Sequence, residues 1–182
     1  MKHSRLTIGK FDLAALAFGL ALGAVATVPA MASGGGGGGS TPTCAKGQVF
    51  DAKKKGCVKA ERGVLPDQQM TEYAYALAKE GRFTEALDTL DLLDNPNTAR
   101  ALNYRGYATR KLGRTEEGIS YYLKSVALDP NYAQVREYLG EAYVIQGKLD
   151  LAKQQLTTIK SICGADCTEY EDLSDAISSA KL

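Results

Sequence analysis

The chain has 182 residues, of which 45% are hydrophobic and 24% charged, and its formal net charge is +1. This composition is typical of a globular protein and excludes a wholly disordered chain or a protein that crosses a membrane many times. The only histidine is His3, in a segment that we expect to be cleaved off. The mature protein would then lack the imidazole of His-based triads, metal sites and general bases, so we expect no catalysis, no metal and no cofactor.

Residues 1–32 predict a signal peptide. Three basic residues precede an uncharged apolar stretch, 13–28, and small residues at Ala30 and Ala32 fit a signal-peptidase site. The apolar stretch is shorter than the roughly 20 residues needed to cross a bilayer. Cleavage would leave a periplasmic or secreted protein with no stable membrane span, whereas an uncleaved N-terminal anchor is the alternative.

Four cysteines remain in the exported chain, where disulfides are favoured. Four cysteines allow three pairings. We favour Cys44 with Cys57 and Cys163 with Cys167, because each pair lies within one short segment. Structural zinc is disfavoured, since neither pair has the spacing of a zinc knuckle and no histidine is available.

A linker and a small basic hairpin come first in the mature chain. Residues 33–43 include six consecutive glycines and predict a flexible linker. Residues 44–62 hold six basic and two acidic side chains, with strand-forming runs at 48–50 and 57–58 around turn residues. A disulfide here would close a loop of about 14 residues and contribute about 3 kcal/mol by restricting the unfolded chain.

The hairpin allows two interpretations. Its pattern C-x-x-G-x-V-F-D…K-x-C resembles the cysteine hairpin of peritrophin-like chitin-binding modules. That resemblance implies contact with cell-wall glycan, through Phe50 and the lysines. The other interpretation is a structural clip at the start of the following domain.

A helical sequence repeat fills the remaining segment, 65–182. Residues 102–108 align with 136–142 at a shift of 34, and the preceding copy aligns at a shift of 32. Such a period is the signature of stacked helical hairpins. We expect the three hairpins at 67–98, 99–132 and 133–166, with a shorter second helix or turn in the first.

Glycines and capping residues mark the helices of each unit. Gly106 and Gly140 lie in the middle of first helices, where glycine indicates close helix contact. The glycines expected to end the first helices in a left-handed conformation are Gly81, Gly113 and Gly147. The residues expected to start helices are Asn95-Pro96, Asp129-Pro130, Thr84 and Thr115.

These features resemble the tetratricopeptide repeat (TPR), in a protein of an exported bacterial type. The resemblance rests on the period, the small residue within each first helix, and Leu128-Asp129-Pro130 at the end of a unit. It implies an all-α fold, a right-handed α-solenoid of three helical hairpins preceded by the small disulfide hairpin. Gly118 stands where the family usually has alanine, which predicts softer packing at that position.

Residues 168–182 predict a final helix that caps the solenoid. Thr168 and Glu171 form a capping-box pattern, and Leu173, Ile177 and Ala180 form an apolar stripe. A solenoid exposes its last hydrophobic face unless another element covers it. A Cys163–Cys167 disulfide would fix the turn into this helix, and a functional dithiol is the alternative.

The concave side of the solenoid is the predicted binding site. Packing within the second unit would use Leu102, Gly106 and Leu112, which leaves the opposite face of the first helices for a partner. The candidate groove residues are Tyr75, Lys79, Arg100, Asn103, Tyr104, Tyr107, Arg110, Lys111, Glu137, Tyr138 and Glu141. We expect a tyrosine-lined groove that is basic in its middle and acidic at one end, although Tyr104 and Tyr138 could instead pack between units.

The TPR resemblance implies recognition of a peptide segment or helix from another protein. We therefore expect a non-catalytic adaptor, with glycan binding by the hairpin as the alternative. The family's clamp for a chaperone's C-terminal carboxylate is not reproduced, because Tyr75, Glu137 and Tyr138 stand where amide or basic side chains would be needed. Nucleic acid is not expected as a partner, since the chain beyond residue 62 holds 13 basic and 18 acidic side chains.

Overall fold

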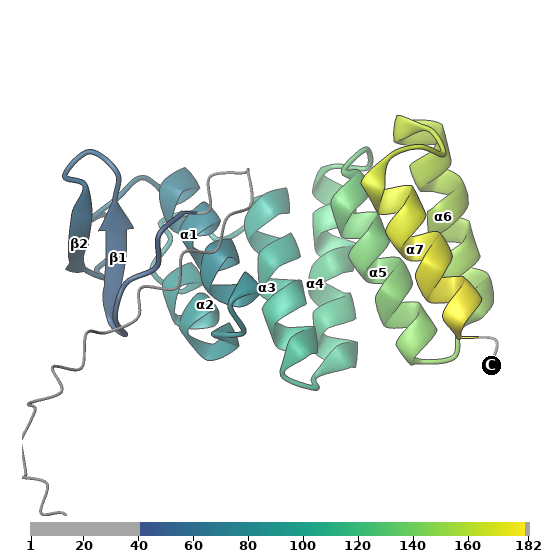
Figure 1. Ribbon diagram of the computed structural model, residues 1–182, viewed down its shortest axis with the longest axis horizontal. Coiled ribbons are helices and arrows are strands. Elements are labelled where there is room, and N and C mark those ends of the chain that lie inside the picture. Colours follow the sequence, from purple (N-terminus) through teal and green to yellow (C-terminus); the bar gives the residue numbers. More distant parts are fainter. Residues whose placement is uncertain (1–40, 181–182) are drawn as a thin grey trace, which may run out of the picture. The chain divides into compact units, whose positions relative to one another are not determined.

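The computed structural model describes residues 41–180, so the predicted signal peptide and most of the predicted linker lie outside the described residues. A two-stranded antiparallel sheet comes first in this part of the chain, and helices follow it (Figure 1). The elements are β1 (Gln48–Asp51), β2 (Gly56–Lys59), α1 (Asp67–Lys79), α2 (Phe83–Leu90), α3 (Ala99–Lys111), α4 (Thr115–Leu128), α5 (Ala133–Ile145), α6 (Leu149–Cys163) and α7 (Thr168–Ser179).

The helices form three hairpins and a cap. α1 packs on α2, α3 on α4 and α5 on α6, and each later unit also packs on the one before it. α7 contacts both α5 and α6, and so takes the place of the next first helix (Figure 1). The predicted repeats and capping helix are confirmed, as is the short second helix of the first unit: α2 has 8 residues and α4 has 14.

The first helices end where the sequence predicts, but α3 and α5 do not begin where it predicts. Gly81, Gly113 and Gly147 have φ of 80°, 86° and 71°, as expected of left-handed residues that end helices. The expected caps at Asn95-Pro96 and Asp129-Pro130 are wrong, since α3 and α5 begin only at Ala99 and Ala133.

The threonines at helix starts also differ from expectation. Thr98 caps α3, and its side chain accepts a hydrogen bond from the Ala101 N–H at 3.2 Å. Thr115 and Thr168 are the first residues of α4 and α7, and Thr84 lies inside α2, so none of these three is an N-cap. Helices therefore begin up to three residues away from where the capping patterns place them.

Small residues bring the helices together. A Cβ at Gly106 would lie 2.6 Å from Tyr122 Cε1, and one at Gly118 would lie 2.9 Å from the Gly106 carbonyl oxygen. Gly106 and Gly118 therefore allow the backbones of α3 and α4 to approach closely. The expectation of softer packing at Gly118 is wrong, because an alanine would not fit there. Leu112 is also a correction, since its side chain is exposed and takes no part in the core.

The disulfide hairpin packs against the first unit. Cys44 and Cys57 are joined, and the Cys44 N–H donates a hydrogen bond to the Tyr73 hydroxyl at 2.7 Å. Arg82 donates to the Cys44 carbonyl at 2.8 Å, and Val49 is completely buried. The hairpin thus covers the outer side of α1 as an N-terminal cap, in line with its interpretation as a structural clip.

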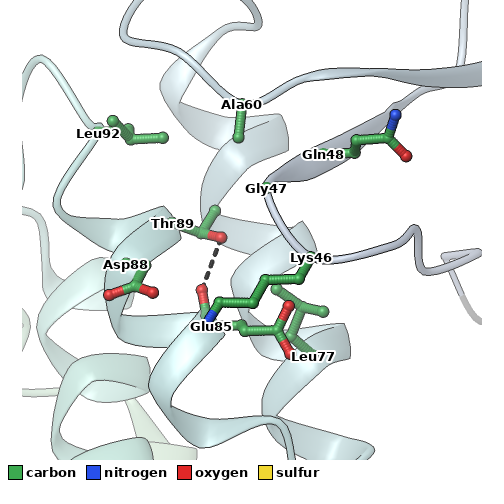
Figure 2. A pocket seen from close by; sticks show the side chains of 9 residues that line it. All are labelled: Lys46, Gly47, Gln48, Ala60, Leu77, Glu85, Asp88, Thr89 and Leu92. Carbon is green, nitrogen blue, oxygen red and sulfur yellow. Dashed lines mark hydrogen bonds between the residues drawn. The ribbon is translucent and has the colours of Figure 1, made fainter.

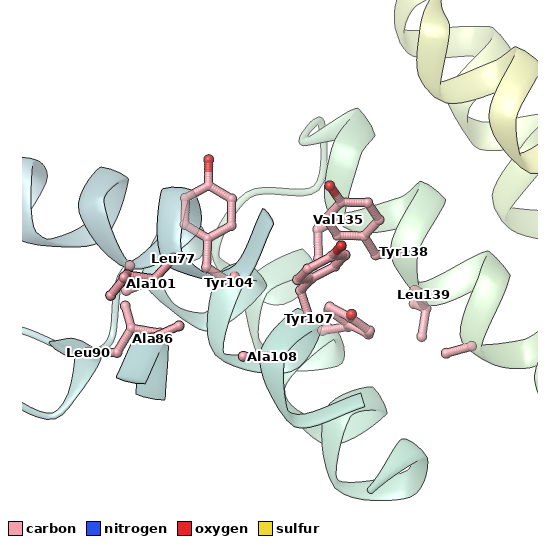
Figure 3. Close-up of a cluster of buried hydrophobic side chains, with 14 of the residues drawn as sticks. Leu77, Ala86, Leu90, Ala101, Tyr104, Tyr107, Ala108, Val135, Tyr138 and Leu139 are labelled. Carbon is pink, nitrogen blue, oxygen red and sulfur yellow. The ribbon is translucent and has the colours of Figure 1, made fainter. Parts of the chain in front are cut away.

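The core runs along the interior of the stacked units. Leu77 and Leu90 belong to the first unit, Ala108 to the second and Leu139 to the third, and all are buried (Figure 3). Cys163 and Cys167 are joined at the turn before α7. Among residues 41–180, none of the helices combines the length and the apolar character needed to cross a membrane.

Two glycines allow a test of the close helix contacts. In Gly106→Ala the added Cβ meets the completely buried Tyr122 ring and the Gly118 carbonyl, whereas in Gly140→Ala it meets the two methyl groups of Leu173. Leu173 is also completely buried, but its methyl groups are the far end of a flexible side chain and can shift, whereas the rigid Tyr122 ring and the Gly118 backbone carbonyl cannot. We expect Gly106→Ala to lower the free energy of unfolding by about 1–3 kcal/mol, and Gly140→Ala by less, in urea denaturation. Equal losses, or a gain at position 106, would contradict this packing.

Candidate functional site

Tyrosine rings from the first helices of all three units form one cluster. The Tyr75 and Tyr104 rings are stacked with centroids 4.2 Å apart, and those of Tyr107 and Tyr138 are 5.0 Å apart. Tyr75 also meets Tyr107 edge to face at 6.4 Å, and its hydroxyl lies 3.1 Å from that of Tyr138. Figure 3 shows Tyr104 and Tyr107 on α3 and Tyr138 on α5. We call these four residues the tyrosine cluster, and the side of α1, α3 and α5 that carries them the first-helix face.

Most rings of the tyrosine cluster are buried. Tyr104, Tyr107 and Tyr138 are 5%, 9% and 6% exposed, while Tyr75 is half-buried. Burial raises the pKa of Tyr104, Tyr107 and Tyr138, so all three are neutral hydroxyls. Packing between units, the alternative weighed for Tyr104 and Tyr138, is therefore what the structure contains. Tyr75 is the ring of this cluster that a partner can reach.

Basic side chains lie over these rings. The Lys79 Nζ is 5.8 Å from the Tyr75 centroid, and the Lys111 Nζ is 5.4 Å from that of Tyr107. Both lysines are exposed, and neither forms an ion pair with a residue of the described chain. They provide positive charge at the C-terminal ends of α1 and α3, along one edge of the first-helix face.

Arg110 is buried and already engaged. Its Nη2 donates to a Glu141 carboxylate oxygen at 2.5 Å, and its Nε donates to the Tyr122 hydroxyl at 3.2 Å. Its guanidinium also lies 6.0 Å from the Tyr138 centroid. The expectation of a free arginine is wrong, because α5 covers this part of α3. Arg110 instead fixes α4 and α5 relative to α3.

Asn103 joins the second and third units. It is completely buried, and its Nδ2 donates hydrogen bonds to the Tyr132 hydroxyl at 3.1 Å and to Gln134 Oε1 at 3.0 Å. It is therefore inaccessible to a partner, contrary to expectation. Arg100 remains exposed, paired with Glu72. Sequence reasoning missed Tyr132, whose only signal is its position at the joint between two units.

Glu137 and Glu141 lie toward the end of the face at α7. Glu141 is half-buried, whereas Glu137 is only 7% exposed. Burial raises the pKa of the Glu137 carboxyl to about 8, and the neighbouring carboxylate of Glu141 adds to the rise. The acidic end expected from the sequence is present, but its central carboxyl lies deep between helices.

The predicted site residues thus fall into three groups. The exposed ones are Lys79, Arg100 and Lys111; the half-buried ones are Tyr75 and Glu141; the buried ones are Asn103, Tyr104, Tyr107, Arg110, Glu137 and Tyr138. A helical wheel separates the face that packs within a unit from the opposite face, but neighbouring units cover much of that opposite face as well. The accessible part of the site is smaller and more strongly charged than expected.

Cavities add to this face near α1. One of about 310 Å³ is lined by Gln68, Thr71 and Arg100, at the start of α1 and α3. A second, of about 340 Å³, lies between the hairpin and α1, and Phe50 and Gln68 line it. Since both include Gln68, the hollow continues from the first-helix face to the hairpin. Phe50 belongs to this hollow, which the sequence did not indicate.

A third cavity separates the hairpin from α2. It measures about 230 Å³ and is lined on the hairpin side by Lys46 and Ala60 and on the helix side by Glu85, Asp88 and Leu92 (Figure 2). Lys46 extends over α2 beside Glu85 (Figure 2). Its charge contributes to lowering the pKa of that carboxyl, although Arg82, which binds it directly at 2.8 Å, has the larger effect.

Metal ligands converge at one place in residues 41–180. Cys163, Cys167 and Glu169 have ligand atoms within 4.8 Å of one another. The two sulfur atoms are joined in a disulfide, so neither is the thiolate that a metal requires.

Comparison with known proteins identifies the repeat. The tetratricopeptide-repeat family matches residues 99–132 and, through a second family description, residues 121–154. No protein of curated function matches this sequence.

Solved structures share the fold at low sequence identity. The first TPR of Spaghetti (RPAP3) bound to an HSP90 peptide matches with a TM-score of 0.54 and 22% identity, over 63% of this chain and 92% of that one. The Yersinia enterocolitica type III secretion chaperone SycD, in complex with a peptide of the translocator YopD, matches with a TM-score of 0.52 and 19% identity, over 65% and 93%. MamA matches with a TM-score of 0.53 and 19% identity, over 64% and 69%.

The buried carboxyl of Glu137 predicts a pH dependence of stability. Its pKa in the folded chain lies above the ordinary value of 4.5, so the folded chain binds more protons than the unfolded chain between those values. The free energy of unfolding should therefore fall as the pH rises from about 5 to about 8, by at most about 1.4 kcal/mol per pH unit for this one proton. Urea denaturation of the protein and of Glu137→Gln measures the difference, which should widen in favour of the variant as the pH rises. Glu116→Gln, at an exposed position, is the control, and parallel curves for protein and Glu137→Gln would refute the assignment.

Proposed function

Because the chain belongs to the tetratricopeptide-repeat family, we propose that it is a non-catalytic adaptor that binds a peptide segment or helix of another protein along the first-helix face. The observation that carries this proposal is the accessible Tyr75 ring with exposed Lys79 and Lys111 around the tyrosine cluster. Aromatic side chains beside unpaired positive charge are typical of binding surfaces, where the ring supplies contact area and the charge supplies orientation.

The surface is rigid before a partner arrives. The rings that support Tyr75 are held by stacking, and Arg110 is held by hydrogen bonds to Tyr122 and Glu141. Side chains that are already ordered lose little conformational entropy on binding. The free energy of contact is therefore available for affinity.

Charge along the face defines the partner's chemistry. Arg100 is paired with Glu72, so it is partly neutralised, whereas Lys79 and Lys111 have no carboxylate partner among the described residues. An acidic side chain of the partner placed near these two lysines would gain an ion pair beside an apolar ring. We infer a segment with at least one acidic and one apolar or aromatic residue.

Structures of similar fold support a polypeptide ligand. RPAP3 and SycD are each described with a bound peptide from another protein. The carboxylate clamp is not part of the proposal, because Tyr75, Glu137 and Tyr138 replace the groups it needs, and Glu137 and Tyr138 are buried. We therefore propose recognition of an internal segment, without a role for its terminal carboxylate.

We also propose that the protein acts outside the cytosol, in the periplasm or beyond. The signal-peptide pattern of 1–32 supports this location, and so does the pairing of all four cysteines in disulfides. Disulfides of this kind are rare in proteins of the cytosol.

The two exposed lysines provide the direct test of the binding face. Peptides selected from a displayed random library against the purified protein should bind Lys79→Glu/Lys111→Glu about tenfold more weakly or worse, because two attractions become repulsions. Isothermal titration calorimetry measures the affinities. Lys124→Glu is a matched control, since Lys124 is also an exposed lysine over a tyrosine ring, at 5.5 Å from Tyr121 on α4. Unchanged binding in the double variant, or an equal loss in the control, would contradict the proposal.

The glycan alternative has its own variant. The hairpin has three exposed lysines at its tip: Lys53, Lys54 and Lys55. They are on a different element from Lys79 and Lys111. If the hairpin binds cell-wall glycan, retention on chitin or peptidoglycan should disappear when these lysines become glutamates and should survive Lys79→Glu/Lys111→Glu. Loss of peptide binding in Lys79→Glu/Lys111→Glu, with peptide binding kept when the three hairpin lysines become glutamates, would favour the adaptor.

Export predicts a defined N-terminus. Expressed in a bacterial host with a secretion system, the protein should accumulate outside the cytosol and begin at Ser33, because the cleavage pattern ends at Ala32. Terminal sequencing of the purified protein and mass spectrometry without reduction check both the cleavage and the two disulfides. Recovery of an intact N-terminus with free thiols from the cytosol would overturn the proposed location.

A further inference from the structure

Acidic residues gather where the first-helix face meets α7, and we call this group the acidic recess. It consists of Glu137 and Glu141 on α5 and of Glu169 and Asp172 on α7. The two helices are held together at Leu173, which packs on Gly140. The carboxylates of Glu141, Asp172 and Glu169 all act on Glu137 and raise its pKa further, after the larger effect of burial.

Glu137 is the unusual member of the acidic recess. It is more than nine-tenths buried, yet it forms no hydrogen bond or ion pair with any described residue. Neither carboxyl oxygen of Glu137 is among the fully enclosed polar atoms that lack a hydrogen-bond partner in the described chain; since Glu137 has no such partner, its carboxyl group opens to the surface. A carboxylate in such a poorly solvated position is disfavoured, and a hydrogen-bond donor from a partner would stabilise it.

The repeat shows what this position normally does. Asn103 lies 34 residues earlier, at the equivalent place in α3, and it donates hydrogen bonds to Tyr132 and Gln134 of the next unit. At Glu137 a carboxyl group replaces that donor, and α7, which packs on α5, carries the acids Glu169 and Asp172 that raise the pKa of Glu137. No described residue donates a hydrogen bond to Glu137.

The nearest positive charge does not balance the acidic recess. Arg110 lowers the pKa of Glu137, but it is the smallest of the influences on it. Its Nη2 is engaged with Glu141 at 2.5 Å and its Nε with Tyr122. Arg110 is therefore already engaged by two partners and forms no ion pair with Glu137.

We propose that the acidic recess receives a lysine or arginine side chain of the polypeptide bound on the first-helix face. This inference rests on the proposed function and adds the partner's chemistry at one end of the site. A metal ion is a poorer occupant, because these carboxylates are not among the groups within 4.8 Å of one another that could hold an ion in the described chain. A long basic side chain can reach between separated carboxylates and donate several hydrogen bonds.

The inference also gives the bound segment a direction. Lys79 and Lys111 attract acidic residues at the C-terminal ends of α1 and α3, and the acidic recess attracts a basic residue at the α7 end. A segment with its acidic and basic residues exchanged would meet repulsion at both places.

Peptide selection against two forms of the protein tests the inference. Peptides selected on the protein from a displayed random library should carry a lysine or arginine at a constant distance from an acidic residue. Selection on Glu137→Gln should lose the basic residue and keep the acidic one. A synthetic peptide of the selected sequence should bind Glu137→Gln roughly tenfold to a hundredfold more weakly, and its norleucine-for-lysine form should bind both proteins equally. Glu116→Gln, an exposed acid of α4, is the matched control and should bind like the protein.

Proton release provides a second measurement that does not depend on affinity. At pH 7 the Glu137 carboxyl is largely protonated, so capture of a lysine should expel a proton. Calorimetry in buffers of different ionisation enthalpy should detect this release with the lysine peptide and not with the norleucine peptide.

The outcomes separate the two proposals. Peptides that depend on Lys79 and Lys111 but show no basic preference, or no proton release, would overturn this inference and leave the adaptor intact. Proton release on addition of Ca²⁺ or Mg²⁺ alone would also overturn it in favour of a metal site. Absence of any selected peptide, or peptides indifferent to the two lysines, would overturn the proposed function itself.

Discussion

The close approach of α3 and α4 at Gly106 and Gly118 is the contact on which the binding face depends. Neither glycine leaves room for a methyl group, so the two backbones touch directly. This distance places the Tyr122 ring against α3, where its hydroxyl accepts a hydrogen bond from Arg110. Arg110 in turn binds Glu141 on α5. A backbone contact inside one unit thereby sets the position of the next.

The same chain of contacts explains why the tyrosine cluster is rigid but mostly closed. Tyr138 packs against both Tyr107 and Tyr122, so the rings fill the joint between the second and third units. Rings used in this way contribute buried apolar area to folding and cannot contribute it again to binding. What remains for a partner is the Tyr75 ring and the charges at the edge of the cluster. The face is therefore suited to a segment that combines one apolar anchor with specific charges.

Much of the fold follows from the sequence because every unit has to bury the same kind of surface. The 34-residue shift locates the hairpins, and glycines such as Gly113 locate helix ends, since a left-handed residue is required there. Helix starts are less determined: Asn95-Pro96 is an adequate local signal, yet α3 begins after Thr98, whose side chain caps it. The docking of the hairpin on α1 has no local signal, because it depends on contacts such as that of Cys44 with Tyr73, 29 residues apart.

The candidate site was predictable in its residue types and not in their exposure. Sequence periodicity identifies the side of α3 that does not face α4, and it correctly collects Tyr107 and Lys111 on that side. It cannot tell that α5 and α1 cover most of it, since the angle between units is a property of the stack. In an isolated α3, Asn103 and Arg110 would be surface residues. In the stacked helices both are buried.

α7 gives the last unit a function that a simple cap would not need. A cap has to cover apolar residues of α5 and α6, and Leu173 and Ile177 do so. Glu169 and Asp172 contribute nothing to that burial, and their charges disfavour the ionised form of Glu137. A cap selected for stability alone would place a donor opposite the Glu137 acceptor, just as the third unit places the acceptor Gln134 Oε1 opposite the donor Asn103 Nδ2. Acids that oppose a buried acid make sense when a positive group from outside the chain binds among them, so the end of the solenoid is better explained as a wall of the binding site than as a closure.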